Sequence, residues 1–163
     1  MKRVGCLIGL LLFLGAGAGL FYIYASMLHP EWLSARLRAE LGALPVRVGQ
    51  ADEAAIRAVY GPPASERRGP NSVMLTYPGV TFRLAEPGMK LQWVEVTTPD
   101  LTTGQGLHVG HPWLELMSRY GKEQSASAFP DSHRYRYRWG LRYTLDFFVD
   151  SRGQITKYQF WQA

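Results

Sequence analysis

Two segments of the chain share the same order of residues, and this internal repeat constrains the fold more than any other feature. The segments run from Val46 to Pro63 and from Gly106 to Lys122. Each places Val-Gly ahead of a short amphipathic stretch that ends in Tyr-Gly, at Tyr60-Gly61 and at Tyr120-Gly121. Gly directly after a periodic stretch is a usual end of a helix, because Gly adopts the left-handed conformation without strain. The pattern predicts two short helices at equivalent positions.

An alternating apolar pattern follows each predicted helix and is typical of a β-hairpin. In the first copy the strands surround Pro78-Gly79, a two-residue loop. In the second copy the predicted loop is Arg138-Trp139-Gly140, which places Arg136 opposite Arg142. One further strand is predicted after each hairpin, at 89–97 and 154–161.

These elements predict an α+β fold built from two tandem helix–antiparallel-meander repeats behind an N-terminal transmembrane helix. The expected boundaries are 1–28 for the membrane anchor, 29–98 for a helix plus the first repeat, and 99–163 for the second repeat. The additional helix is expected from Pro30 to Leu44, with Glu40 on its polar side.

The N-terminal expectation rests on the stretch from Val4 to Leu28, which contains no charged residue and follows Lys2 and Arg3. About 20 apolar residues suffice for a membrane-spanning helix, and the preceding cations favour a cytoplasmic N-terminus. Because Ala16-Gly17-Ala18 resembles a cleavage site, a cleaved signal peptide is the alternative. Both interpretations place the remainder outside the cytoplasm. With the uncleaved anchor, the chain is expected to be a single-pass protein of the bacterial cytoplasmic membrane.

The repeated Val-Gly and Tyr-Gly positions, the hairpin patterns and the final Gly153-Gln-Ile-Thr-Lys-Tyr-Gln-Phe160 resemble the repeat of the β-lactamase-inhibitory-protein-like (BLIP-like) fold. The same unit occurs singly in the SmpA/OmlA outer-membrane assembly lipoproteins. The chain departs from both groups, since it has neither the disulfide cysteines of the inhibitors nor a lipobox. The resemblance implies a fold that binds proteins through an open sheet face.

The segment from His133 to Arg142 is the main candidate for partner binding. Alternation places three of its arginines on the strand face opposite the aromatic residues. A cluster of cations on one hairpin favours an anionic partner, or Asp146 as an internal counter-ion. The alternative is a solvated outer face whose arginine stems cover apolar sheet surface. The candidate residues are Arg134, Arg136, Arg138, Arg142 and Trp139.

A metal site is a weaker possibility at His108, His111 and Glu115, because His108 precedes the helix that would carry the other two. Capping or surface histidines explain this pattern as well. The sequence contains no nucleophile motif, phosphate loop or zinc-protease motif, so we expect neither enzymatic activity nor a cofactor.

The chain carries a formal net charge of +5, and the part after the expected anchor carries only +3, with 16 Lys and Arg against 13 Asp and Glu. Nucleic-acid binding requires a concentrated basic face, so nucleic acid is not an expected partner. We expect a membrane-anchored extracytoplasmic module that binds an envelope or secreted protein. The alternative is a structural or regulatory envelope factor that binds anionic lipid or wall polymer.

Overall fold

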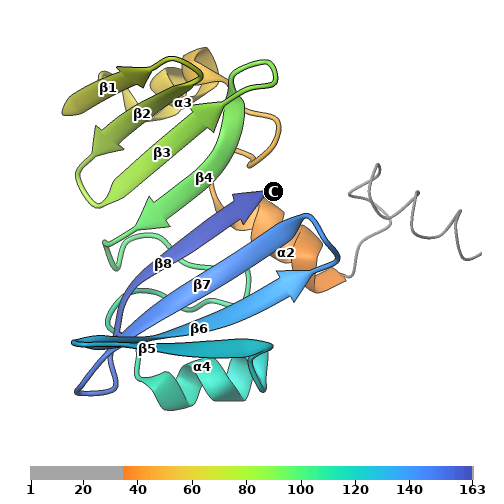
Figure 1. Ribbon diagram of the computed structural model, residues 1–163, viewed down its shortest axis with the longest axis vertical. Coiled ribbons are helices and arrows are strands. Elements are labelled where there is room, and N and C mark those ends of the chain that lie inside the picture. Colours follow the sequence, from red (N-terminus) through yellow and green to blue (C-terminus); the bar gives the residue numbers. More distant parts are fainter. Residues whose placement is uncertain (1–34, 163) are drawn as a thin grey trace, which may run out of the picture. The chain divides into compact units, whose positions relative to one another are not determined.

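The computed structural model describes residues 35–162, and every strand in this range belongs to one antiparallel sheet (Figure 1). The strand order is β1-β2-β3-β4-β8-β7-β6-β5, so the central β4–β8 pair joins the first four strands to the last four. The strands are β1 (Ser65–Gly69), β2 (Ser72–Tyr77), β3 (Val80–Ala85), β4 (Lys90–Val96), β5 (Ser125–Phe129), β6 (Ser132–Trp139), β7 (Tyr143–Asp150) and β8 (Ile155–Gln162).

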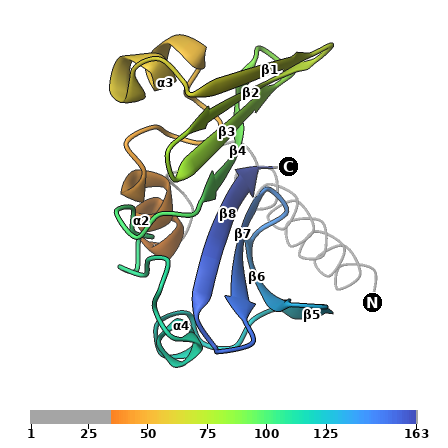
Figure 2. The same cartoon turned by 90° about the vertical axis from the view of Figure 1, so that its left-hand side faces the viewer.

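Three helices lie on one side of this sheet in the described range (Figure 2). They are α2 (Ala35–Ala43), α3 (Glu53–Tyr60) and α4 (Trp113–Tyr120). Both α3 and α4 end where the sequence predicts, at Gly61 (φ 78°) and Gly121 (φ 75°). These left-handed angles favour glycine, because a Cβ atom would be strained there.

Each of these helix ends is tied to the hairpin that follows it by the same contact. The hydroxyl of Tyr77 donates to the carbonyl of Gly61 (3.1 Å), and the hydroxyl of Tyr137 donates to the carbonyl of Gly121 (3.0 Å). The local structure therefore recurs in both halves of the chain, as the repeated sequence pattern suggests.

The core lies between the sheet and the helices, and the alternating residues of the strands fill it. At the centre Val94 pairs with Phe160, and Val96 pairs with Tyr158, so the core is continuous across the β4–β8 junction. The largest fully buried side chains include Phe82, Phe147, Leu75, Leu84 and Leu145.

The expected fold class is wrong. The described chain is an eight-stranded antiparallel sheet with few helices, rather than two BLIP-like repeats behind a membrane helix. The predicted boundary at residue 98 falls between β4 and α4, but hydrogen bonds between β4 and β8 place strands from both sides of it in one sheet. The edge-to-edge pairing of β4 with β8 decides this architecture.

The expected transmembrane helix falls on residues 1–28, which lie outside the described residues. Between residues 35 and 162, no helix has both the length and the apolar character needed to cross a membrane. The sequence predicted a membrane-anchored, BLIP-like protein with a signal anchor. The structure corrects this: the described part is mainly a β-sheet and shows no membrane span.

The register of the second hairpin also differs from the expectation. The loop is Gly140-Leu141-Arg142, with Trp139 opposite Tyr143, and Arg136 faces Asp146 instead of Arg142. The loop lies two residues further along the chain, so the partner of each β6 residue shifts by four. An even shift leaves the same side chains on each face, so the alternation does not distinguish these registers. The observed register replaces a repulsive pair of cations with an ion pair, which favours it.

Candidate binding groove

A groove of about 560 Å³ lies on the sheet face opposite the helices, which we call the open face. Most of its lining side chains alternate along the strands with the buried residues of the core, and they come from both halves of the sheet. The lining residues are Met74, Arg83, Gln92, Trp93, Arg134, Arg136, Asp146, Gln159, Trp161 and Gln162.

Two tryptophans form the middle of the groove. Trp93 on β4 and Trp161 on β8 are directly paired across the central junction, so their side chains leave the sheet on the same face. Both are half-buried. The indole N–H of Trp161 is buried and has no hydrogen-bond partner among the described residues.

A buried ion pair stands beside the tryptophans. Arg136 donates from Nε and Nη2 to the two carboxylate oxygens of Asp146, at 2.7 and 2.6 Å. The side chain of Asp146 is 2% exposed and that of Arg136 is 14% exposed. The hydrogen bond to Asp146 raises the pKa of Arg136 above its ordinary value. The guanidinium also lies 5.2 Å from the ring centre of Trp161, so Arg136 is held in one orientation.

The other two arginines of the groove are not paired with carboxylates in the described part of the chain. Arg134 donates to the hydroxyl of Ser127 (3.2 Å), and its guanidinium lies 5.5 Å from the ring centre of Phe129. Arg83 is exposed on β3 and makes no ion pair with any described residue. The groove therefore has a surplus of positive charge.

Amide side chains at the edges of the groove are fixed by their neighbours. The Gln92 amide donates to the carbonyl of Glu86 (2.8 Å), and the Gln159 amide donates to the carboxylate of Glu95 (2.7 Å). Glu95 also accepts from Lys157 at 2.8 Å, so its charge is already compensated. The polar walls of the groove are thus ordered before any ligand binds.

The structure brings only two of the five predicted partner-binding residues into the groove, Arg134 and Arg136. Arg138 is exposed on the same face of β6 and does not line it. Arg142 lies in the hairpin loop and donates to the Gln162 amide oxygen (2.9 and 2.7 Å) when that oxygen is turned toward it. The prediction that Asp146 is a counter-ion of the arginines is confirmed for Arg136.

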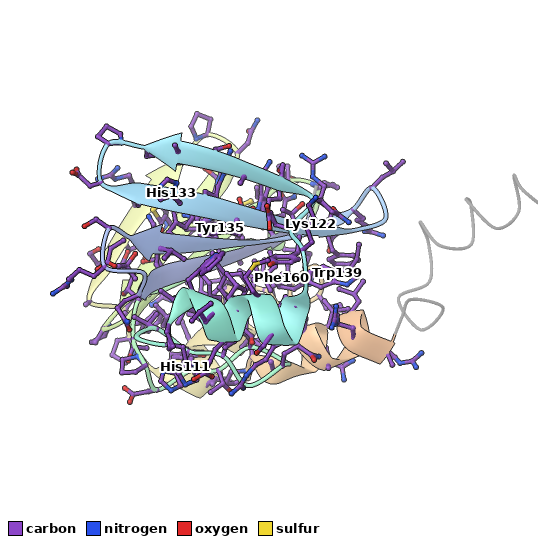
Figure 3. The ribbon with its side chains drawn as sticks, turned by 90° about the horizontal axis from the view of Figure 1, so that it is seen from below. His111, Lys122, His133, Tyr135, Trp139 and Phe160 are labelled. Atoms are coloured by element: carbon purple, nitrogen blue, oxygen red, sulfur yellow. The ribbon has the colours of Figure 1, made fainter. Side chains whose placement is uncertain are left out.

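Trp139 lies on the opposite, helix-facing side of the sheet. Its ring packs against Phe160 with 6.5 Å between ring centres, and Figure 3 shows the two side chains next to each other. The alternation of β6 separates Trp139 from Arg134, Arg136 and Arg138. The five residues therefore do not form one surface.

The two histidines considered as metal ligands contact each other. The rings of His108 and His111 are 3.6 Å apart, centre to centre, and Nδ1 of His111 accepts from the backbone N–H of His108 (3.3 Å). Glu115 lies 3.9 Å from His111 and accepts from Arg119 at 2.8 Å. Among residues 35–162, no three metal-binding side chains are grouped closely enough to hold an ion.

The sequence-based interpretation missed Trp93, Trp161 and Arg83 as members of a site. Alternation along β4 and β8 could have placed both tryptophans on the face opposite the core. The alternation does not predict that β4 pairs with β8, because these strands are far apart in the chain. Only that pairing brings the tryptophans side by side.

No protein-family model matches the chain, and the comparison with curated protein sequences finds no match. Solved structures do share its fold. One is a DUF4309 family protein, YjgB, from Bacillus subtilis, with 17% identity and a TM-score of 0.53 over 77% of this chain and 90% of that chain.

Two further similar structures are larger. One is an extracellular protein containing an SCP domain from Bacillus anthracis, with 10% identity and a TM-score of 0.55 over 70% of this chain and 43% of that one. The other is a cysteine-rich secretory protein from Staphylococcus aureus, with 9% identity and a TM-score of 0.52 over 70% and 44%. None of these three is described as a β-lactamase-inhibitory or SmpA/OmlA protein. At such low identity the likeness concerns the fold alone.

Proposed function

We propose that the chain is an extracytoplasmic binding module without catalytic activity, and that it binds a secreted or envelope protein through the groove of its open face. The observation that carries this proposal is the composition of the groove. Trp, Arg and Met are enriched where proteins bind each other, and Trp and Arg dominate the residues that contribute most binding energy. Trp93, Trp161 and Met74 line the groove together with Arg83 and Arg134, which have no acidic partner among the described residues.

The order of the groove supports the same proposal. Binding costs conformational entropy for every side chain that becomes fixed, so side chains already fixed in the free protein reduce that cost. Arg136 is held by Asp146 and Trp161, and Gln92 and Gln159 are held by neighbouring groups. An extracytoplasmic location is supported by the similar structures described as extracellular and secretory proteins.

The proposal is tested by affinity capture from cross-linked cell envelopes and culture medium, with the full chain as bait. The groove variant is Trp93→Gln. The control is Leu114→Gln, which changes a 70% exposed side chain on α4, on the other side of the sheet. We expect a protein that the parent and the control retain and the groove variant loses. Equal recovery by all three baits would contradict binding through the groove.

The alternative partner, an anionic lipid or wall polymer, is distinguished by salt. Binding to a polyanion weakens steeply with ionic strength, whereas a packed protein interface is less sensitive. Retention that disappears in about 1 M salt, where the Debye length is about 3 Å, would favour that alternative.

A further inference from the structure

The charges of the groove identify the chemistry of what it binds. Three arginines and one carboxylate line it, and the carboxylate, Asp146, is already paired with Arg136. Arg83 and Arg134 remain without an acidic partner in the described chain. A ligand that brings negative charge gains favourable electrostatic interactions with both guanidinium groups, and arginine binds carboxylates in a well-defined geometry.

The two free arginines lie on opposite sides of the tryptophan pair. Arg83 is on β3, and its direct neighbour across the sheet is Trp93, which in turn neighbours Trp161. Arg134 is on β6, beyond β8 and β7 in the strand order, and it lies four residues along β6 from Arg138, the residue in register with the tryptophan pair. A ligand that reaches both arginines therefore runs diagonally across the sheet and passes over the central β4–β8 pair, which carries the two indole rings.

The distance between the arginines sets the length of such a ligand. Four steps of about 4.8 Å separate β3 from β6, which gives about 19 Å across the sheet. The offset of four residues adds about 13 Å along the strands, so the two arginine positions are about 23 Å apart. An extended peptide advances about 3.3 Å per residue, so about seven residues cover this distance. Two acidic groups with apolar material between them fit the groove.

We infer that the groove binds an extended acidic segment of the partner protein. One carboxylate binds Arg83, another binds Arg134, and an apolar side chain between them packs on Trp93 and Trp161. This inference rests on the proposed function and adds the chemistry of the partner. A polyanion fits less well, because such ligands need a continuous row of cations, whereas Asp146 and the paired Glu95 interrupt this face.

The inference is tested by titrating the purified full chain with the peptide Glu-Gly-Ser-Leu-Ser-Gly-Glu while intrinsic tryptophan fluorescence is followed. The control peptide has Gln in place of both Glu residues. We expect a saturable change with the acidic peptide and about tenfold weaker binding of the control peptide, because two exposed ion pairs are removed. The change should be lost in a variant that combines Trp93→Phe and Trp161→Phe.

Matched variants locate the charge recognition. Arg83→Gln and Arg134→Gln should each weaken binding of the acidic peptide about two- to fivefold. Arg138→Gln is the control, since Arg138 is exposed on the same strand and face as Arg134 but outside the groove. Thermal unfolding of each variant verifies that it is folded.

Three results would overturn the inference: no saturable change with the acidic peptide, equal affinity for both peptides, or equal weakening by Arg138→Gln. Binding of phosphatidylglycerol vesicles that depends on Arg83 and Arg134, without binding of the peptide, would overturn it in favour of a lipid. Each of these results leaves the capture experiment able to succeed, so failure of the acidic segment and failure of protein binding are distinguishable.

Discussion

Asp146 and Glu40 are both buried carboxylates, but they accept hydrogen bonds from different kinds of donor. Asp146 meets a guanidinium through two short hydrogen bonds. Glu40 accepts from the hydroxyl of Tyr120 (2.5 Å) and from the backbone N–H of Gly104 (2.8 Å), and burial raises its pKa above the ordinary value. One residue therefore depends on a counter-charge and the other on neutral donors.

Replacing Asp146 with Ala should destabilise the protein by about 2–3 kcal/mol. Breaking a buried ion pair costs about 3–5 kcal/mol, and the partial exposure of Arg136 lowers that value. The measurement is the midpoint of urea unfolding. In the double variant Asp146→Leu with Arg136→Met the loss should be much smaller, since no unpaired charge remains. A loss below about 0.5 kcal/mol in Asp146→Ala would show that water already screens Arg136.

The raised pKa of Glu40 should make the stability of the protein depend on pH. Because the pKa of Glu40 is raised in the folded state, folding favours the protonated carboxyl. The stabilisation that the protonated Glu40 gives the folded state is complete below the ordinary pKa of 4.5. It is lost as the pH rises through the pKa of Glu40 in the folded state. Glu40→Gln removes this loss while keeping an acceptor for Gly104.

The melting temperature of Glu40→Gln relative to the parent should therefore increase as pH rises from about 4 to 8. Glu86→Gln is the control, because Glu86 is exposed. A difference from the parent that stays constant over this range would refute the prediction.

At the scale of elements, the position of α2 depends on a close backbone contact. A Cβ atom on Gly104 would lie 2.4 Å from the carbonyl carbon of Ala39 and 2.5 Å from the backbone nitrogen of Glu40. The backbone of α2 thus touches the β4–α4 connection directly, and only glycine fits between them. The sequence predicted α2 as a helix but placed Glu40 on its polar side, whereas this contact buries it.

Gly104→Ala should displace α2 and destabilise the protein by about 1–3 kcal/mol, because helix backbone cannot move aside as a flexible side chain can. The control is Gly42→Ala, in α2 itself, where no atom other than those of the adjacent residues and the helix's own backbone lies within 4 Å of the added Cβ. That variant should be neutral or up to about 1 kcal/mol more stable, since Ala favours a helix. The measurement is the hydrogen-exchange protection of α2 in the two variants and in the parent protein. Unchanged protection of α2 in Gly104→Ala would contradict the close packing.

At the scale of the whole sheet, the β4–β8 junction makes the two halves one cooperative unit. Phe160 pairs with Val94 across the junction and is 3% exposed. Phe160→Ala should destabilise the protein by about 3–5 kcal/mol. It should also reduce hydrogen-exchange protection in β2 and β3 as well as in β6 and β7. If protection from hydrogen exchange fell only in β5–β8, the two halves of the sheet would unfold independently, which would contradict this prediction. Leu141→Ala, at a side chain that is 80% exposed in the loop, should change little.

Local patterns in the sequence were sufficient for the parts of the fold that depend on neighbouring residues. The ends of α3 and α4 follow from Gly61 and Gly121, and the first hairpin has the predicted pairing of Tyr77 with Val80 around Pro78-Gly79. The second hairpin required more, because an even shift in register, here of four residues, keeps every side chain on its face. There the pairing of Arg136 with Asp146 identifies the register.

By itself, the sequence determined the short helices, the alternating strands and the separation of the β6 arginines from Tyr135, Tyr137 and Trp139. These depend on the conformational freedom of glycine and on a period of two residues, both of which are local properties. Only the tertiary structure decided that β4 pairs with β8, that Trp93 lies beside Trp161, and that Arg83 and Arg134 line one groove. Strand edges can pair with many partners, so a contact between strands this distant along the chain is chosen by packing of the whole molecule.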